Sequence, residues 1–582
     1  MVAPLGRGGL LARATIVGLS SFGIATVINC SSDDCSQTLT CDDPTGGGDN
    51  STGGAGDGAA GPSSGGGAPS SGGAGGGVAT TTCDGPEDCD GSVCIDGYCC
   101  DSTCDASCEA CDVSGSEGIC TLLAAGDPSE GDCPGVCDGQ GHCVDGAFDS
   151  SFDAVVGSVM LLDATDNYVT ANQFYLQIDV EETELTAKYG SGQHSDASKD
   201  SYVAKYSSGG TFSWVKQIGD PPNVLEGDGR RQLVYGLAHD DSNNLFVTGY
   251  FHGEIVFPGC NKVISTDSES TQYGDPFLAK LDAGGNCQWR LGIVTSGEQA
   301  AFGVTTDDDG ASYMTGFIIG DVDFGGGAVR GDGSTTSFVA KYLASSEFDW
   351  VKTFDGSGSQ QGTKLASHGD AVFVVGRASQ TINLGGDNLD QGSDSNLFVG
   401  KFDKAGNHIW STGFPDGGGS SGDQDALQIT SQGDVILSGQ AGTEPPDFGG
   451  GSLGNGGGYV VKLDGSDGTH VWSKGFGDGT GEFISQMAVD SDDNIVVAGQ
   501  FPDAIDLGGG KLFSNGNDDI FLAKLAQDGT HLWSKSFGSI DGVERPSGLD
   551  VDGDGRIFLT ASITEIDWGG GMTSDSVAIF SP

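Results

Sequence analysis

From residue 147 onward, apolar and polar residues alternate in short runs that are separated by Gly, Asp and Asn. Alternation with a period of two is typical of half-buried β-strands, and hairpin turns select Gly, Asp and Asn. The helical spacing of apolar positions does not recur in this region. We therefore predict an all-β region built from short antiparallel strands.

These strands recur in a fixed order along the chain. One strand has the pattern apolar-x-Ala/Gly-Lys, with Val461 replacing the small residue in one copy, and a tryptophan follows its lysine after nine or ten residues. An alternating strand that ends near a small residue precedes each such pair, as in Phe246–Gly249. Successive lysines are 75, 61, 60, 61 and 62 residues apart. The repeated pairs are Lys205 with Trp214, Lys280 with Trp289, Lys341 with Trp350, Lys401 with Trp410, Lys462 with Trp472, and Lys524 with Trp533.

A unit of this length with about four strands is typical of a β-propeller blade. The strand that ends near a small residue occurs seven times, and the last unit stops after Val577–Phe580, one outer strand short. The segment Phe148–Phe152 resembles Trp533–Phe537 and lies just before the first unit. We predict a seven-bladed β-propeller in which this amino-terminal strand closes the last blade, with Phe148 in the place of a tryptophan.

Units such as those containing Phe277–Lys280 and Phe338–Lys341 resemble bacterial propeller repeats of the SBBP type. The resemblance covers about residues 147–582 and implies the propeller fold. It implies little about function, because that family is defined by its architecture. The stretch Lys280–Trp289 also resembles the docking hairpin of quinoprotein propellers, but those generally have eight blades. A quinone-dependent oxidoreductase is therefore disfavoured.

Residues 1–29 have the composition of a signal peptide. Arg7 and Arg13 precede a mostly apolar, uncharged run over 14–28 that is short for a membrane span. Its end, Val27–Cys30, resembles a bacterial lipobox with an unusual Asn29, which implies lipid attachment at Cys30. The alternative is an ordinary signal peptide followed by a structural Cys30. We expect export in a Gram-negative bacterium, as an outer-membrane-anchored lipoprotein or an extracellular protein.

Two segments separate this signal from the propeller at 147–582. Residues 30–82 form a Gly/Ser-rich tether that we expect to be disordered, because it can bury very little apolar surface. Residues 83–146 hold twelve of the 17 cysteines, which is typical of a disulfide scaffold in an oxidising compartment. We predict six disulfides there, with their connectivity open. Zinc binding or redox catalysis at the CxxC of Cys108–Cys111 is disfavoured, because His142 is the only nearby imidazole and no βαβ context surrounds the motif.

The propeller itself contains Cys260 and Cys287, both in the unit with the longest spacing. We predict a disulfide between them that pins the enlarged segment 263–276, which contains Tyr273. This segment and 220–231, with Arg230 and Arg231 in an acidic surrounding, are the least repetitive loops. Because the strands of a propeller are occupied in packing, we expect these loops to bind a ligand, an extracellular glycan or protein. The alternative is that both are tolerated surface insertions.

Composition and motifs also bear on whether the chain binds nucleic acid, a membrane surface or a metal ion. Acidic residues outnumber basic ones 82 to 25, giving a net charge of −57, which excludes nucleic acid and electrostatic membrane docking. The DxDxDG motif at Asp550–Gly555 leaves calcium open, but Ala561 stands where a calcium loop needs Glu, and hairpin turns favour the same residues. The evenly repeated His408, His470 and His531 indicate repeat features and not a metal cluster.

The sequence therefore predicts no cofactor, no metal site and no catalytic set. We expect a monomeric, non-enzymatic binding or scaffold protein that presents a propeller on a flexible tether. The alternative is an extracellular propeller hydrolase or lyase acting on a polysaccharide, because catalytic residues scattered over loops form no linear motif.

Overall fold

The computed structural model describes residues 146–154, 157–175, 177–187, 199–219, 231–265, 272–331, 334–415, 426–441, 446–454, 457–477, 481–540, 542, 544–563 and 565–582. Before residue 146 it describes only the backbone of three short hairpins: β1 (Val93–Ile95) with β2 (Tyr98–Cys100), β3 (Glu109–Ala110) with β4 (Thr121–Leu122), and β5 (Val136–Cys137) with β6 (Cys143–Val144). The predicted signal peptide, Cys30, the tether and the disulfides of the Cys-rich module lie outside the described residues.

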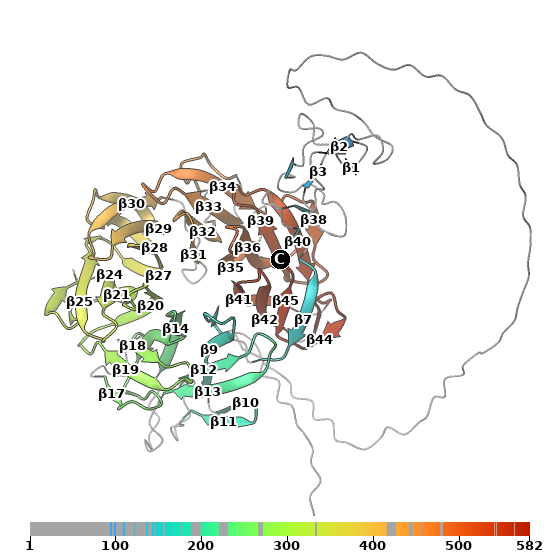
Figure 1. Cartoon of the computed structure of the whole chain (residues 1–582). Coiled ribbons are helices and arrows are strands. Elements are labelled where there is room, and N and C mark those ends of the chain that lie inside the picture. Colours follow the sequence, from blue (N-terminus) through green and yellow to red (C-terminus); the bar gives the residue numbers. More distant parts are fainter. Residues whose placement is uncertain are drawn as a thin grey trace, which may run out of the picture. The chain divides into compact units, whose positions relative to one another are not determined.

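Seven antiparallel sheets, the blades, follow one another around a ring, as predicted (Figure 1). Blade 1 has β8 (Val159–Leu162), β9 (Tyr168–Tyr175), β12 (Lys199–Tyr206) and β13 (Phe212–Ile218); blade 2 has β14 (Gln232–His239), β15 (Leu245–Phe251), β18 (Asp275–Leu281) and β19 (Cys287–Gly292); blade 3 has β20 (Gln299–Thr306), β21 (Ser312–Ile318), β24 (Thr336–Tyr342) and β25 (Phe348–Phe354); blade 4 has β27 (Gln360–His368), β28 (Ala371–Ile382), β29 (Leu389–Asp403) and β30 (His408–Phe414), with β26 (Gly356–Ser357) beside β28.

The remaining blades repeat the same order of four strands. Blade 5 has β31 (Ala426–Ile429), β32 (Val435–Gln440), β33 (Gly458–Leu463) and β34 (His470–Phe476); blade 6 has β35 (Phe483–Val489), β36 (Ile495–Phe501), β39 (Asp519–Leu525) and β40 (His531–Phe537); blade 7 has β41 (Arg545–Val551), β42 (Ile557–Ser562), β45 (Val577–Phe580) and β7 (Phe148–Phe152). No helix among the described residues is long and apolar enough to cross a membrane.

Small two-stranded hairpins follow the second strand of five blades. They are β10 (Gln177–Val180) with β11 (Thr183–Thr186), β16 (Glu254–Ile255) with β17 (Val263–Ile264), β22 (Asp321–Asp323) with β23 (Ala328–Arg330), β37 (Ala504–Asp506) with β38 (Lys511–Phe513), and β43 (Ile566–Asp567) with β44 (Met572–Thr573).

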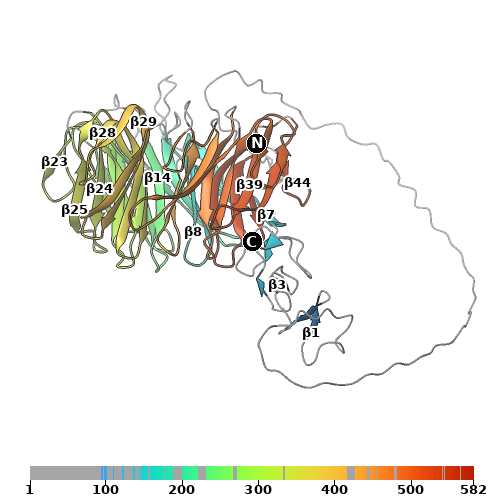
Figure 2. The same cartoon turned by 90° about the horizontal axis from the view of Figure 1, so that it is seen from above.

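The first strand of each blade is innermost and the fourth is outermost, so the repeated tryptophans lie on the outer strands. The strands run from one face of the ring to the other (Figure 2). Consequently the tight turns between first and second and between third and fourth strands share one face, which we call the turn face. The second-to-third and blade-to-blade segments share the opposite face, which we call the connection face.

The hydrophobic core lies between neighbouring blades. In one cluster, Phe246 and Leu278 of blade 2 pack with Met314 and Phe338 of blade 3, and all four are fully buried. Equivalent clusters join the other blades. The alternating pattern of each strand therefore buries one face against the preceding blade and the other against the following blade.

The repeated lysine makes a buried ion pair at the turn face. In blade 2, the Lys280 Nζ lies 2.8 Å from Asp240 in the turn between the first two strands and 4.9 Å from the Phe246 ring centroid. The Asp240 carboxylate also accepts backbone N–H groups of its own turn, from Ser242 and Asn244. Four other blades repeat the pair: Lys205–Asp163, Lys341–Asp307, Lys462–Asp434 and Lys524–Asp490.

In four blades the repeated tryptophan forms a hydrogen bond with the next blade. The Trp410 Nε1 donates a hydrogen bond to the Gly465 carbonyl of the following blade at 3.1 Å, and Trp472 donates to Gln527 at 3.0 Å. A left-handed glycine of the same turn packs on the ring: Gly468 has a φ of +76°, and a Cβ there would lie 2.6 Å from Trp410. Two further inter-blade bonds of this kind are Trp214–Ala283 and Trp350–Lys404.

The last blade is closed by the amino-terminal strand, as predicted: β7 pairs with β45 (Figure 1). The Ser581 N–H donates to the Ala147 carbonyl at 2.8 Å, which completes a turn between two ends of the described chain. Gly146, with a φ of +58°, packs against Trp533 as the turn glycines of other blades do. The ring thus has no unpaired third strand at its seam.

The predicted role of Phe148 is wrong by two residues. Ser150 pairs with Ile579, the position that corresponds to the repeated Trp–Lys pairing, whereas Phe148 pairs with Phe580. Phe148 therefore occupies the place of His408, His470 and His531. The bulge at this point is common to all seven blades; the alignment is displaced because Ser150 stands where the other blades have tryptophan, so the motif residue is missing from this strand.

The lysine pairs give a testable comparison between blades 2 and 4. Burial works to raise the pKa of Asp240, but Lys280 and Asn244 hold it below its usual value, so the pair stabilises the fold above that usual value and the contribution is lost as the pH falls. Lys401 has no such carboxylate; it donates to the Gly465 carbonyl at 2.6 Å, and burial lowers its pKa.

We expect Lys280→Met to lower the free energy of unfolding by about 3 kcal/mol, because it leaves the Asp240 carboxylate without its cation. Lys401→Met should cost less than about 1 kcal/mol, because it leaves no carboxylate unpaired. Denaturant unfolding at pH 7 measures both variants. Equal losses would contradict the role assigned to the ion pair.

Candidate functional site

The carboxylates of the DxDxDG motif at Asp550–Gly555 form hydrogen bonds and an ion pair within the protein. The Asp552 Oδ1 accepts the backbone N–H groups of Asp554 and Arg556 in its own turn, and its Oδ2 forms an ion pair with Arg556 at 2.7 Å. The Asp550 carboxylate accepts the backbone N–H groups of Leu162 and Val551. The DxDxDG segment is thus a hairpin turn, with carboxylates that point to different partners. No group of three or more His, Cys, Asp or Glu in the described part of the chain could hold a metal ion.

The three repeated histidines pack under glycine turns. A Cβ on Gly450 would lie 2.3 Å from the His470 ring, and the imidazole Nε2 lies 3.0 Å from Ser473 Oγ. Gly386 and Gly509 lie against His408 and His531 in the same way, and burial lowers the pKa of both imidazoles. The histidines are repeat features, as the even spacing predicts.

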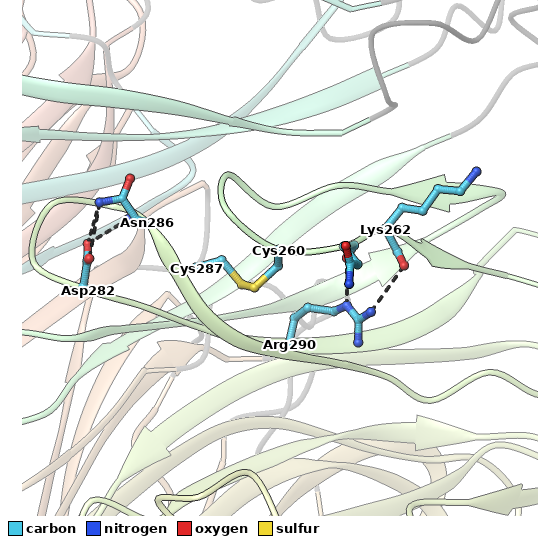
Figure 3. The surroundings of a disulfide bond; sticks show 7 residues. Cys260, Lys262, Asp282, Asn286, Cys287 and Arg290 are labelled. Carbon is cyan, nitrogen blue, oxygen red and sulfur yellow. Dashed lines mark hydrogen bonds between the residues drawn. A yellow bond between two sulfur atoms is a disulfide. The ribbon is translucent and has the colours of Figure 1, made fainter.

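The disulfide of blade 2 replaces this contact. Cys287 occupies the position of these histidines, and Cys260 lies in the turn between β16 and β17, with a Cα–Cα distance of 5.6 Å (Figure 3). Arg290 donates to the carbonyls of Asn261 and Lys262 beside it. The predicted disulfide is confirmed, and it fastens the small hairpin, whose strand β17 begins the enlarged segment 263–276, to the outer strand.

The repeat breaks on the connection face of blades 2 and 3. Five innermost strands bulge at the same position near their start, so that one residue has no partner in the ladder. That residue is Tyr235 in blade 2 and Phe302 in blade 3, but Thr363, Ser485 and Ser547 in blades 4, 6 and 7.

The second strands break the repeat at the adjacent position. The residue after the repeated small residue is Tyr250 in blade 2 and Phe317 in blade 3. The other blades carry a polar residue there: Asn172, Arg377, Gln440, Gln500 and Ser562. Among the blades compared, aromatic residues at these two positions therefore occur only in blades 2 and 3, at the end of the strands that meets the connection face.

These four rings form two stacks. Tyr235 lies parallel to Tyr250 with centroids 5.7 Å apart and planes 19° apart, and Phe302 lies on Phe317 at 6.0 Å and 30°. The outer rings, Tyr235 and Phe302, meet edge to face at 5.3 Å. Tyr273 packs edge-on against Phe317 at 5.0 Å and against Tyr250 at 5.5 Å. We call these five residues the aromatic cluster.

Two rings of the aromatic cluster are buried and the other three are half-buried. Tyr250 and Phe317 are 3% and 2% exposed, whereas Tyr235, Tyr273 and Phe302 are half-buried. Burial raises the pKa of Tyr250, and the neighbouring Arg231 partly offsets this. The rings of Tyr235 and Phe302 are thus stacked on buried rings that hold them in place, and they keep an accessible surface near Arg231.

Two of the three predicted ligand-binding residues meet here. Tyr273 belongs to the cluster, and Arg231 lies beside Tyr250, with its carbonyl accepting the His252 N–H at 2.9 Å. Arg230 and most of the two predicted loops lie outside the described residues. Sequence reasoning missed Tyr235, Tyr250, Phe302 and Phe317, although comparing the same position from blade to blade would have singled them out.

Comparisons with known proteins add only structural neighbours. No protein-family model matches the chain, and no curated protein matches it. Similar solved structures include an ulvan lyase of polysaccharide lyase family 25 (10% identity, 75% of this chain and 94% of that one, TM-score 0.36) and BamB from Moraxella catarrhalis (11%, 73% and 100%, 0.27). A quinohemoprotein alcohol dehydrogenase from Comamonas testosteroni is also similar (10%, 69% and 67%, 0.33). Similarities this weak carry no argument about function.

Proposed function

We propose that this protein is a non-enzymatic binding protein that holds an extracellular glycan at the aromatic cluster on the connection face of its propeller. The observation that carries the proposal is the confinement of Tyr235, Phe302 and their supporting rings to two blades. The inter-blade packing does not need aromatic residues there, because the other blades fold with polar ones.

The geometry of the cluster suits a sugar ring. A pyranose presents one apolar C–H face and polar hydroxyls at its edge, which matches a fixed aromatic ring with Tyr hydroxyls and Arg231 nearby. Stacking on rings that are already held in place costs little conformational entropy. Three half-buried rings also offer far less area than the roughly 800 Å² per partner of a standard protein–protein interface.

A polysaccharide hydrolase or lyase is the second candidate. The grouping of His252, Tyr250 and Arg231 supports it, because a proton-transferring pair beside a cation is what elimination next to a carboxylate requires. Against it, Tyr250 and His252 are 3% and 2% exposed, so a polymer does not reach them in this arrangement. Binding therefore accounts better for the site than catalysis does.

The binding proposal is tested with the full-length chain on a glycan microarray, followed by titration of the strongest glycan. Tyr235→Ala with Phe302→Ala should weaken that affinity at least tenfold, because both stacking faces are removed. Phe513→Ala is the matched control, since Phe513 is an exposed aromatic residue (66%) in blade 6; it should bind as the unaltered protein does.

Unchanged affinity in the double variant would contradict the assigned site. If no glycan binds, the glycan proposal fails and a polypeptide partner becomes the alternative. Shortening of the bound glycan, followed by chromatography, would instead support the hydrolase or lyase.

We also propose that the protein is exported and anchored in the outer membrane through a lipid on Cys30. The basic residues, apolar run and cysteine of the first 30 residues support this, and the Gly/Ser-rich segment after them would let the propeller extend from the surface. Cys30→Ser should move the protein from the membrane fraction to the soluble fraction and abolish labelling by a fatty-acid analogue. Unaltered fractionation without label in either form would contradict the anchor.

A further inference from the structure

The junctions between blades share a buried polar residue just before the bulge of the innermost strand. It is Gln232, Gln299 and Gln360 at the start of blades 2, 3 and 4, and each is 0% exposed. Their amide groups donate to backbone carbonyls; Gln232, for example, donates to His252 and Glu254 at 3.1 and 3.2 Å. In these three blades the position is therefore filled by a neutral side chain that donates hydrogen bonds, whereas blades 6 and 7 have Glu482 and Glu544 there.

Blade 7 has Glu544 at this position, beside another buried acid. Glu544 is 1% exposed and Asp519, at the start of β39 in blade 6, is 0% exposed. Glu544 Oε1 accepts from Ser539 Oγ at 2.6 Å, and Asp519 Oδ2 accepts the Asn515 N–H at 2.7 Å. Glu544 Oε2 and Asp519 Oδ1 have no hydrogen-bond partner within the described structure.

No described cation pairs with either carboxyl group. The charged residues nearest in the chain or on the packed strands are Asp518, Lys535 and Arg545, and neither basic residue forms an ion pair with Asp519 or Glu544. Asp518 accepts a hydrogen bond from Gln500 at 3.1 Å and adds negative charge beside Asp519. Two buried carboxylates without a counter-ion are strongly disfavoured.

We propose that Glu544 carries a proton in the folded protein and that the junction between blades 6 and 7 is a pH-sensitive contact of the ring. A protonated carboxyl group has the one donor and one acceptor by which it imitates the glutamine of blades 2, 3 and 4. Burial, with the Asp519 charge adding to it, raises the pKa of Glu544, which agrees with this arrangement. Burial also raises the pKa of Asp519.

The sign of the pH dependence follows from linkage. A raised carboxyl pKa means that the folded state binds more protons than the unfolded state, so this contribution to stability is lost as the pH rises from the ordinary value of 4.5 through the raised one. Glu544→Gln keeps the shape and the donor but cannot ionise. Its advantage over the unaltered chain should therefore increase with pH, by up to tenfold in the folding equilibrium constant per pH unit within that window.

The experiment measures unfolding of the full chain from pH 4 to pH 8 at constant ionic strength, with and without Ca²⁺. Glu544→Gln should match the unaltered protein near pH 4 and be more stable at pH 8. Glu482→Gln is the matched control, because Glu482 is equally buried at the same position of blade 6, and the residue of blade 5 that corresponds to Asp519 is Gly457, which has no carboxyl group. The control should show no growing advantage.

Infrared spectroscopy provides a second readout that does not depend on the stability of the variant. The unaltered protein at pH 7 should show the carbonyl band of a protonated carboxyl group, and Asp519→Asn should shift the titration of this band to lower pH. Absence of the band, or a Glu544→Gln effect that does not change with pH, would overturn the proposal. Stabilisation by Ca²⁺ in the unaltered chain but not in Glu544→Gln would overturn it in favour of a metal site.

Discussion

The contact between the outer tryptophan of one blade and the glycine turn of the next is the interaction on which this ring depends. In four blades the indole donates to a carbonyl of the next turn, and a left-handed turn glycine such as Gly468 or Gly529 packs on its face. The same turn adjoins the third-strand lysine, whose charge is matched by the first turn of its own blade. The repeated lysines and turn glycines thus have structural partners within the ring.

The contrast between positions that repeat in every blade and positions that differ indicates where a binding site can lie. Positions that repeat from blade to blade are constrained by packing, so an asymmetric feature on the ring must have another cause. The aromatic cluster is such a feature, because Tyr235 and Phe302 stand where blades 4, 6 and 7 have hydroxyl residues. Glu544 is another, because it stands beside the buried Asp519 at a junction position where blades 2, 3 and 4 have glutamine.

Much of the architecture could be predicted from the sequence, because period, strand alternation and turn residues are local signals. Seven blades, closure by the amino-terminal strand and the Cys260–Cys287 disulfide all follow from them. The register of β7 could not be predicted, since Ser150 stands where the other blades have tryptophan, and the strand therefore lacks the residue by which it could be aligned. Of the aromatic cluster only Tyr273 was predicted: the other four members lie in four strands of two blades, and a search for repeated motifs passes over residues that differ from blade to blade.

The seam between β45 and β7 carries the central claim that the ring closes as one cooperative unit. Native-state hydrogen exchange on the full chain, read by mass spectrometry of peptides that cover 147–153, measures it directly. The account predicts that these amides exchange with the same opening free energy as those of β45 and of the outer strand β40. Exchange of 147–153 at the rate of unstructured chain, while β45 stays protected, would contradict it.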